Sequence, residues 1–230
     1  MPDLSNYEIA RAFREPGCPL CRVLAVDEER LVQHFWRDSR LLPPVRMTFF
    51  ASGGFCRRHA WLMHDQVMKR AKGRGGALTE LYDRMAARDL RRIREITDDA
   101  LEHSELVEGL RAWAQRSECR ACIELAEATS RRAHFLCQLL REEGMVDAYR
   151  ASEGLCLPHL HAAVRRSAED DPELGRLLLT DWSERLAVLR AQLAEFDRKR
   201  DYRHADEPRG EEQRAPTDAV SRYAGEPPDA

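Results

Sequence analysis

The chain has 230 residues, of which 43% are hydrophobic and 33% are charged, and its formal net charge is -3. These values describe an ordinary soluble surface around one large or two small cores, and they exclude a general attraction to nucleic acid or to an anionic membrane. No apolar run approaches the ~20 residues that span a bilayer. Residues 1–13 lack a basic region followed by an apolar stretch, so we expect no secretory signal and a cytoplasmic location.

The composition predicts an all-α protein. Alanine, leucine, arginine and glutamate dominate, whereas runs of Val, Ile and Thr that alternate with polar residues are nearly absent. In detail, we expect two duplicated helical lobes, each closed by a metal site with three cysteines and one histidine, together with a linking helix and a long C-terminal helix.

The first predicted repeat covers residues 1–76. Its expected helices are bounded by Pro16-Gly17, by Pro43-Pro44 and by Gly53-Gly54, which are turn and helix-end signals. They cover residues 4–14, 20–40, 45–50 and 56 to about 70. The glycine-rich segment 72–76 ends the repeat.

A linking helix is predicted over residues 77–104, followed by a second metal-binding repeat over 105–170. Apolar residues at helical spacing from Leu174 to Phe196 then predict a C-terminal helix within 171–202. Residues 203–230 are rich in Glu, Arg, Pro, Gly and Asp and have few apolar residues. We therefore expect this tail to be disordered.

The evidence for duplication is a matching pair of segments. Residues 51–56 read Ala-Ser-Gly-Gly-Phe-Cys and residues 151–156 read Ala-Ser-Glu-Gly-Leu-Cys, so most positions are identical or similar at one fixed offset. Chance is a poor explanation for this agreement.

Each repeat contains a CxxC pair and a CxxH pair, which together are the ligand set of a closed tetrahedral zinc site. We therefore predict two zinc ions per chain, one in each repeat. The first would be bound by Cys18, Cys21, Cys56 and His59, and the second by Cys119, Cys122, Cys156 and His159. In this interpretation the helix after each CxxC pair and the segment that follows it form a helical hairpin. The metal ion joins the two ends of this hairpin.

Two other chemistries use similar residues. An iron–sulfur cluster is one alternative, although cysteine-only ligation is commoner. Disulfide exchange is another, but no βαβ pattern surrounds the CxxC pairs. A closed zinc site has no open coordination position, which argues against zinc catalysis, so we expect a protein that is not an enzyme.

Three further residues invite attention. His34 and His134 occupy equivalent places in the repeats and are candidates for residues that support the metal ligands, although a partly buried histidine without such a role is the simpler interpretation. Cys137 has no counterpart in the first repeat, and we expect it to be a small buried residue.

The motifs resemble those of the DUF6062 family, a group of bacterial proteins of unknown function. The resemblance rests on Cys18-Pro19-Leu20-Cys21, on Cys119-Arg120-Ala121-Cys122 and on the segments 52–61 and 152–160. It extends over most of the chain before the tail. It implies a helical, duplicated, metal-binding protein and assigns no activity.

The leading hypothesis is a zinc-stabilised helical module that binds another macromolecule, which we expect to be a protein. The alternative is a redox or electron-transfer protein that uses iron–sulfur clusters or exchangeable thiols. Nucleic acid is disfavoured, because acidic residues interleave the arginines at 84, 88, 91 and 92. No membrane partner is expected.

Overall fold

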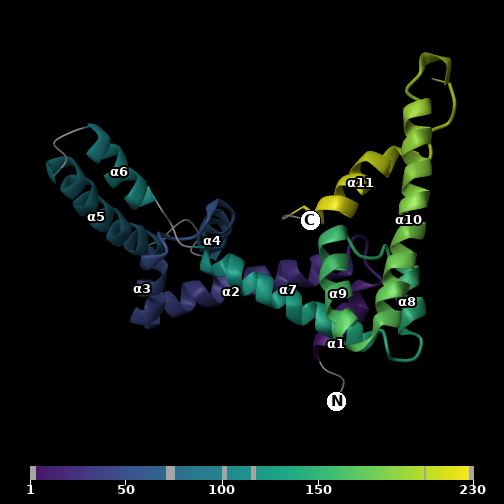
Figure 1. The fold of residues 1–230 in the computed structure, drawn as a ribbon, viewed down its shortest axis with the longest axis horizontal. Helices are drawn as coiled ribbons and strands as arrows, with labels where there is room; N and C mark the ends of the chain where they lie inside the picture. The colour runs from purple at the N-terminus through teal and green to yellow at the C-terminus, as the bar shows by residue number, and fades with distance from the viewer. Residues whose placement is uncertain (1–3, 71–75, 100–102, 115–117, 205, 228–230) are drawn as a thin grey trace. The chain divides into compact units, whose positions relative to one another are not determined.

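The computed structural model describes residues 4–70, 76–99, 103–114, 118–204 and 206–227 (Figure 1). Within these ranges the chain forms α-helices and short 3-10 helices and no strand, so the predicted all-α class is confirmed. The helices are α1 Leu4–Ala12, α2 Pro19–Leu41, α3 Pro43–Ala51, α4 Arg57–Arg70, α5 Gly76–Asp99, α6 His103–Ala114, α7 Arg120–Leu139, α8 Met145–Ala151, α9 Leu157–Asp170, α10 Pro172–Arg198 and α11 Ala215–Ala224.

The helices repeat in the order that the duplication predicts. Helices α1 to α5 and α6 to α10 form two series in which a long second helix begins within the CxxC pair and a short third helix precedes the CxxH pair. Proline at the first turn starts α3, where the missing N–H costs no hydrogen bond. Gly54 and Gly154 have φ of +89° and +74° just before the CxxH pairs, a conformation that favours glycine.

The chain divides into two compact units that mix the repeats. Unit 1 contains residues Met1–Asp27 and Ala126–Ala230, and unit 2 contains Glu28–Leu125. The division falls inside the long helices α2 and α7, so each unit contains a part of both helices. The predicted domain borders at 76/77 and 104/105 therefore do not coincide with the borders of these units.

Unit 2 has an aromatic core that includes the N-terminal part of α5. The rings of Phe35, Phe49 and Phe55 lie 4.6 to 5.2 Å apart, and Leu81 and Met85 of α5 are buried with them. The segment predicted as a linking helix is thus a component of unit 2. Residues 100–102, at the predicted end of that helix, lie outside the described residues.

Helices α5 and α6 form a hairpin in unit 2, which Figure 1 shows side by side. Gly109 of α6 allows a close approach, since a Cβ there would lie 2.8 Å from the Ile96 side chain of α5. None of the α6 residues is buried. Several apolar side chains of this hairpin are therefore left at the surface.

Unit 1 is built on α10, against which α9 and α11 pack (Figure 1). Asp171 caps the N-terminus of α10 by accepting a hydrogen bond of 3.1 Å from the backbone N–H of Leu174. Leu174, Leu178 and Leu189 of α10 are buried, as is Tyr149 of α8. The predicted C-terminal helix is present, four residues shorter at its end than the predicted border of 202.

The tail prediction needs correction, because residues 203–230 contain an ordered, packed helix. After a 3-10 turn at Glu211–Arg214, α11 runs from Ala215 to Ala224, and Ala215 is completely buried. Glu212 is also buried and accepts a hydrogen bond of 3.0 Å from Nζ of Lys199 at the end of α10. Charge pairing and a few small apolar contacts thus hold a segment whose composition is typical of disorder.

None of the described helices is both long enough and apolar enough to cross a membrane.

Candidate metal centres

The structure gathers the eight predicted ligands into two clusters, but it pairs them across the repeats. Cluster 1 consists of Cys18, Cys21, Cys156 and His159, and cluster 2 consists of Cys56, His59, Cys119 and Cys122. Each cluster combines the CxxC pair of one repeat with the CxxH pair of the other. This corrects the grouping that the sequence predicted, in which both pairs of one repeat share an ion.

The geometry of α2 explains the different pairing. The helix has 23 residues and is about 34 Å long, whereas the nine-residue α3 that follows spans only about 13 Å. The return segment is too short to bring Cys56 back to the first turn of α2. His59 instead lies 2.9 Å from Glu28, which is two helical turns, or about 10 Å, beyond Cys21.

In cluster 1, Nδ1 of His159 is the centre of the contacts. It lies 3.4 Å from Sγ of Cys18, 3.4 Å from Sγ of Cys21 and 3.2 Å from Sγ of Cys156. The sulfurs of Cys21 and Cys156 are 3.7 Å apart. All four ligand atoms lie in unit 1 and within 4.8 Å of one another.

Cluster 2 repeats this arrangement in unit 2. Nδ1 of His59 lies 3.3 Å from Sγ of Cys56, 3.7 Å from Sγ of Cys119 and 3.5 Å from Sγ of Cys122. The sulfurs of Cys56 and Cys122 are 3.7 Å apart. No disulfide joins any of these cysteines, all of which are free thiols.

These distances match the edges of a tetrahedron of ligands around one metal ion. With zinc–sulfur bonds of about 2.3 Å and a zinc–nitrogen bond of about 2.0 Å, two sulfurs lie about 3.8 Å apart and a sulfur and a nitrogen about 3.5 Å apart. The separations in both clusters lie close to these values. Both clusters can therefore hold a single metal ion with four protein ligands.

Two helix N-termini meet at each cluster. The CxxC pairs stand at the start of α2 and α7, and the CxxH pairs stand at the start of α9 and α4. The partial positive charge of a helix N-terminus stabilises a thiolate, which is the form of cysteine that binds metal. The same position explains why proline is tolerated as Pro19 and Pro158 within the motifs.

Cluster 2 has a buried carboxylate directly behind its histidine. Glu28 is only 4% exposed, and its Oε1 lies 2.9 Å from Nε2 of His59. Arg58 donates two hydrogen bonds to the same carboxylate, at 2.7 and 2.5 Å. Such a partner orients the ring so that Nδ1 faces the ion, and it makes the nitrogen a better ligand.

The pKa values of this group reflect the contacts. Burial opposes ionisation of Glu28, but the hydrogen bonds from His59 and Arg58 outweigh it and lower the pKa of Glu28 to about 2. Burial likewise disfavours a charged His59, yet Glu28 and the thiols raise its pKa to about 9. Burial raises the pKa of Cys56, while hydrogen bonds from the His59 backbone and side chain lower it to about 7. Binding of a metal ion at neutral pH would therefore release protons from the cluster.

Glu28 and Arg58 are functional candidates that the sequence analysis missed. Glu28 follows Cys21 by seven residues, so it lies on the same face of α2. The seven-residue spacing from Cys21 is a weak signal of this role. Glu28 contacts His59 of cluster 2, whereas Cys18 and Cys21 belong to cluster 1. The equivalent positions of the second repeat are Thr129 and Pro158, which cannot supply the same charged pair.

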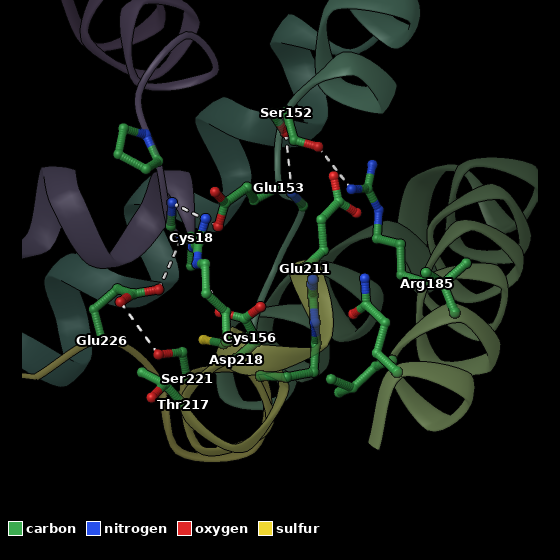
Figure 2. Close-up of a pocket in the computed structure, with 18 of the residues that line it drawn as sticks. Cys18, Ser152, Glu153, Cys156, Arg185, Glu211, Thr217, Asp218, Ser221 and Glu226 are labelled. Atoms are coloured by element: carbon green, nitrogen blue, oxygen red, sulfur yellow. Dashed lines mark hydrogen bonds and ion pairs between the residues drawn. The ribbon is translucent and has the colours of Figure 1, made fainter. Parts of the chain in front are cut away.

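A cavity of about 650 Å³ opens beside cluster 1 in unit 1. Cys18 and Cys156 line it together with residues of α10 and α11, and Figure 2 shows the Glu226 carboxylate bonded to the backbone of Cys18 and to Ser221. Arg185 lines another part of the wall, where it donates to the backbone oxygen of Ser152 at 2.6 Å. The residues after α11 thus take part in the surroundings of cluster 1.

The two histidines predicted to support the ligands lie elsewhere. His34 is an exposed residue of α2. His134 is half-buried on α7, and its Nδ1 accepts a hydrogen bond of 2.9 Å from Nε of Arg166. For cluster 2, the supporting position behind the histidine belongs to Glu28.

Cys137 is buried outside both clusters. Its Sγ lies 3.6 Å from the backbone oxygen of Ala163, and burial raises the pKa of its thiol to about 11. The neutral thiol is therefore the form present at pH 7. This agrees with the small buried residue that the sequence predicted.

Comparison with known proteins identifies the family of the chain. The sequence model of DUF6062, described as a family of unknown function, matches residues 3–230. The chain belongs to this family. The DUF6062 match includes both CxxC pairs, both CxxH pairs and α11, so this last helix lies within the family region. No curated protein and no solved structure matches the chain.

Proposed function

We propose that each cluster binds one zinc ion as a structural site, and that this DUF6062 protein is a non-enzymatic helical module that binds another protein in the cytoplasm. The observation that carries the metal part is the agreement of the sulfur and nitrogen separations with the edges of a zinc tetrahedron in both clusters. Four protein ligands fill the coordination of zinc, which favours a structural over a hydrolytic role.

The cross-repeat pairing supports a role in folding. Each ion would join distant segments, since Cys21 and Cys156 in unit 1 are 135 positions apart and Cys56 and Cys122 in unit 2 are 66 positions apart. Binding free energy at a structural zinc site is coupled to folding, because the ligands are dispersed in the unfolded chain. The ions would then stabilise the scaffold and leave recognition to its surface.

The α5–α6 hairpin is the surface that we propose for protein binding. Five of its apolar side chains are 40% to 54% exposed, and each helix carries pairs of them that are three or four residues apart. They are Leu90, Ile93, Leu106, Val107 and Leu110. Apolar surface of this kind commonly marks a protein-binding region.

Metal analysis of freshly purified, anaerobically handled protein tests the first part. The proposal expects two zinc ions per chain, a colourless protein, and tetrahedral thiolate absorption after replacement of zinc by Co²⁺. Iron with sulfide and visible absorption would favour the redox alternative. The short sulfur separations count against a multi-iron cluster, which spreads its cysteine ligands over more than one metal atom.

Site-specific photo-crosslinking in the native cell tests the binding surface. A crosslinker at Leu106 should trap a discrete protein, whereas one at the exposed neighbour Glu105, or at Glu173 in unit 1, should not. Equal labelling at all three positions, or none at any, would contradict a binding role for the hairpin.

A further inference from the structure

The chain returns to cluster 1 immediately after α11. The backbone N–H of Glu226 donates to Sγ of Cys21 at 3.4 Å. The Glu226 carboxylate accepts a hydrogen bond of 3.2 Å from the backbone N–H of Cys18 through its Oε1. One residue near the C-terminus thus contacts both cysteines of the first CxxC pair, more than 200 positions earlier in the chain.

Gly225 makes this approach possible. A Cβ at this position would lie 3.3 Å from Sγ of Cys21 and 3.7 Å from Sγ of Cys156. Its φ of +88° is one that other residues rarely adopt. The backbone conformation therefore favours glycine, and the space beside the Cys21 sulfur is tight for any larger residue.

Further contacts hold this segment in place. Nη1 of Arg222 donates to the backbone oxygen of Leu155 at 3.1 Å, next to the second CxxH pair. Ser221 donates to the other carboxylate oxygen of Glu226 at 3.4 Å, as Figure 2 shows. The ring of Tyr223 meets that of Trp182 on α10 edge-on, with centroids 6.1 Å apart. The segment is tied to three parts of unit 1.

We propose that residues 221–226, the C-terminal strap, complete the surroundings of the metal ion in cluster 1 and slow its release. The N–H of Glu226 would stabilise the Cys21 thiolate, as groups behind a metal ligand generally do. The strap also covers two ligand sulfurs from one side, which hinders attack by a chelator or a proton. Cluster 2 would then be the site that exchanges its ion faster.

This inference rests on the proposed function, since it requires an ion in cluster 1. Its test uses the complete chain, a chain that ends at Glu226 and a chain that ends at Ala224. The shorter chain keeps α11 but loses Gly225 and Glu226. Zinc release into excess 4-(2-pyridylazo)resorcinol gives the rate for each ion, and the total amplitude gives the metal content.

We expect the chain ending at Ala224 to release one of its two ions at least ten-fold faster than the complete chain. The other ion should leave at an unchanged rate. The chain ending at Glu226 should behave like the complete chain, because it keeps the N–H···S bond. Alkylation mapped by mass spectrometry should show faster labelling of the cluster 1 cysteines, at positions 18, 21 and 156, with no change at 56, 119 and 122.

The Gly225→Val variant gives the same readout without shortening the chain, since its Cβ would press on the Cys21 sulfur at 3.3 Å and its φ of +88° is strained for a β-branched residue, so the strap should move away. Cluster 2 is an internal control for folding in every variant. If both ions leave at unchanged rates in the chain ending at Ala224 and in Gly225→Val, the strap proposal is wrong. The proposal of two metal sites is then unaffected. A complete chain that binds no ion would overturn both the strap proposal and the proposed metal sites.

Discussion

The two clusters use the same four ligand types, but different residues lie behind the ligands. In cluster 2, the buried carboxylate of Glu28 contacts the histidine and accepts hydrogen bonds from Arg58. In cluster 1, the strap contacts a cysteine through Glu226. A duplicated ligand pattern therefore does not imply two equivalent sites, because the stability of a metal site also depends on the groups that orient and cover its ligands. The comparison predicts sites that differ in affinity and in rate.

Removal of both ions should have the largest effect. Structural zinc contributes on the order of 10 kcal/mol to folding in small metal-binding domains at neutral pH. Dialysis against a chelator should therefore reduce the helical circular dichroism signal and lower the melting temperature by more than any substitution below. An apoprotein with unchanged helicity and melting temperature would show that the clusters are not structural sites.

Loss of one ligand should expose the rest of its cluster. In the Cys56→Ser variant, we expect loss of one ion and rapid alkylation of Cys119 and Cys122, because the cross-repeat pairing places these three thiols together. Cys18 and Cys21 should stay protected. Peptide mapping after iodoacetamide treatment distinguishes the two pairings, since pairing within repeats predicts the reverse labelling.

The Cys156→Ser variant is the matched counterpart in cluster 1. It should free Cys18 and Cys21 and leave the thiols of cluster 2 protected. Identical labelling patterns in the two variants would mean that the clusters do not fold or load independently.

Removal of the charge behind His59 should have a smaller effect, limited to cluster 2. Substitutions of such supporting residues typically cost ~10 to 100-fold in metal affinity, and we expect this range for Glu28→Gln in a competition titration with a chelator. Glu29→Gln is the control, because Glu29 is its exposed neighbour. Equal weakening of both sites, or an equal effect of the control, would contradict the assigned role of Glu28.

The smallest effect is expected at Cys137, which belongs to neither cluster. Cys137→Ala should keep both ions and lower the free energy of unfolding by about 1 kcal/mol, since a small buried side chain is shortened. A urea titration with metal analysis measures both quantities. Loss of an ion in this variant would show that Cys137 is coupled to a cluster.

The same thiol has a defined pH dependence. Burial raises its pKa from 9.0 to about 11 in the folded chain. Its contribution to stability is therefore complete below about pH 9 and falls as the pH rises through 11. Comparing wild type and Cys137→Ala across this window should show wild type lose its advantage in the free energy of unfolding and then fall below the variant as the pH rises.

Most helices were predictable because their ends carry local signals. The helix expected over residues 20–40 is α2 Pro19–Leu41, bounded by the turn at Gly17 and by Pro43-Pro44. The C-terminal helix likewise begins at Pro172 behind the Asp171 cap. These signals depend on neighbouring residues only, so no tertiary contact is needed to recognise them.

That residues 215–224 form an ordered helix, α11, was not predictable from composition. Its few apolar residues predict disorder, and the contacts that hold it lie far away in the chain, such as the bond from Arg222 to Leu155. The supporting role of Glu28 was hidden for a similar reason. It depends on His59, which approaches α2 only after the chain has turned at α3.

The sequence by itself determined which eight side chains could bind metal, because ligand chemistry depends on residue type and on spacing within each short motif. It also determined the helical class and the duplication. The tertiary structure decided which pairs share a cluster, and it placed the C-terminal strap beside one of them. The physical reason is the length of α2, a rigid helix of about 34 Å that the nine-residue α3 cannot retrace.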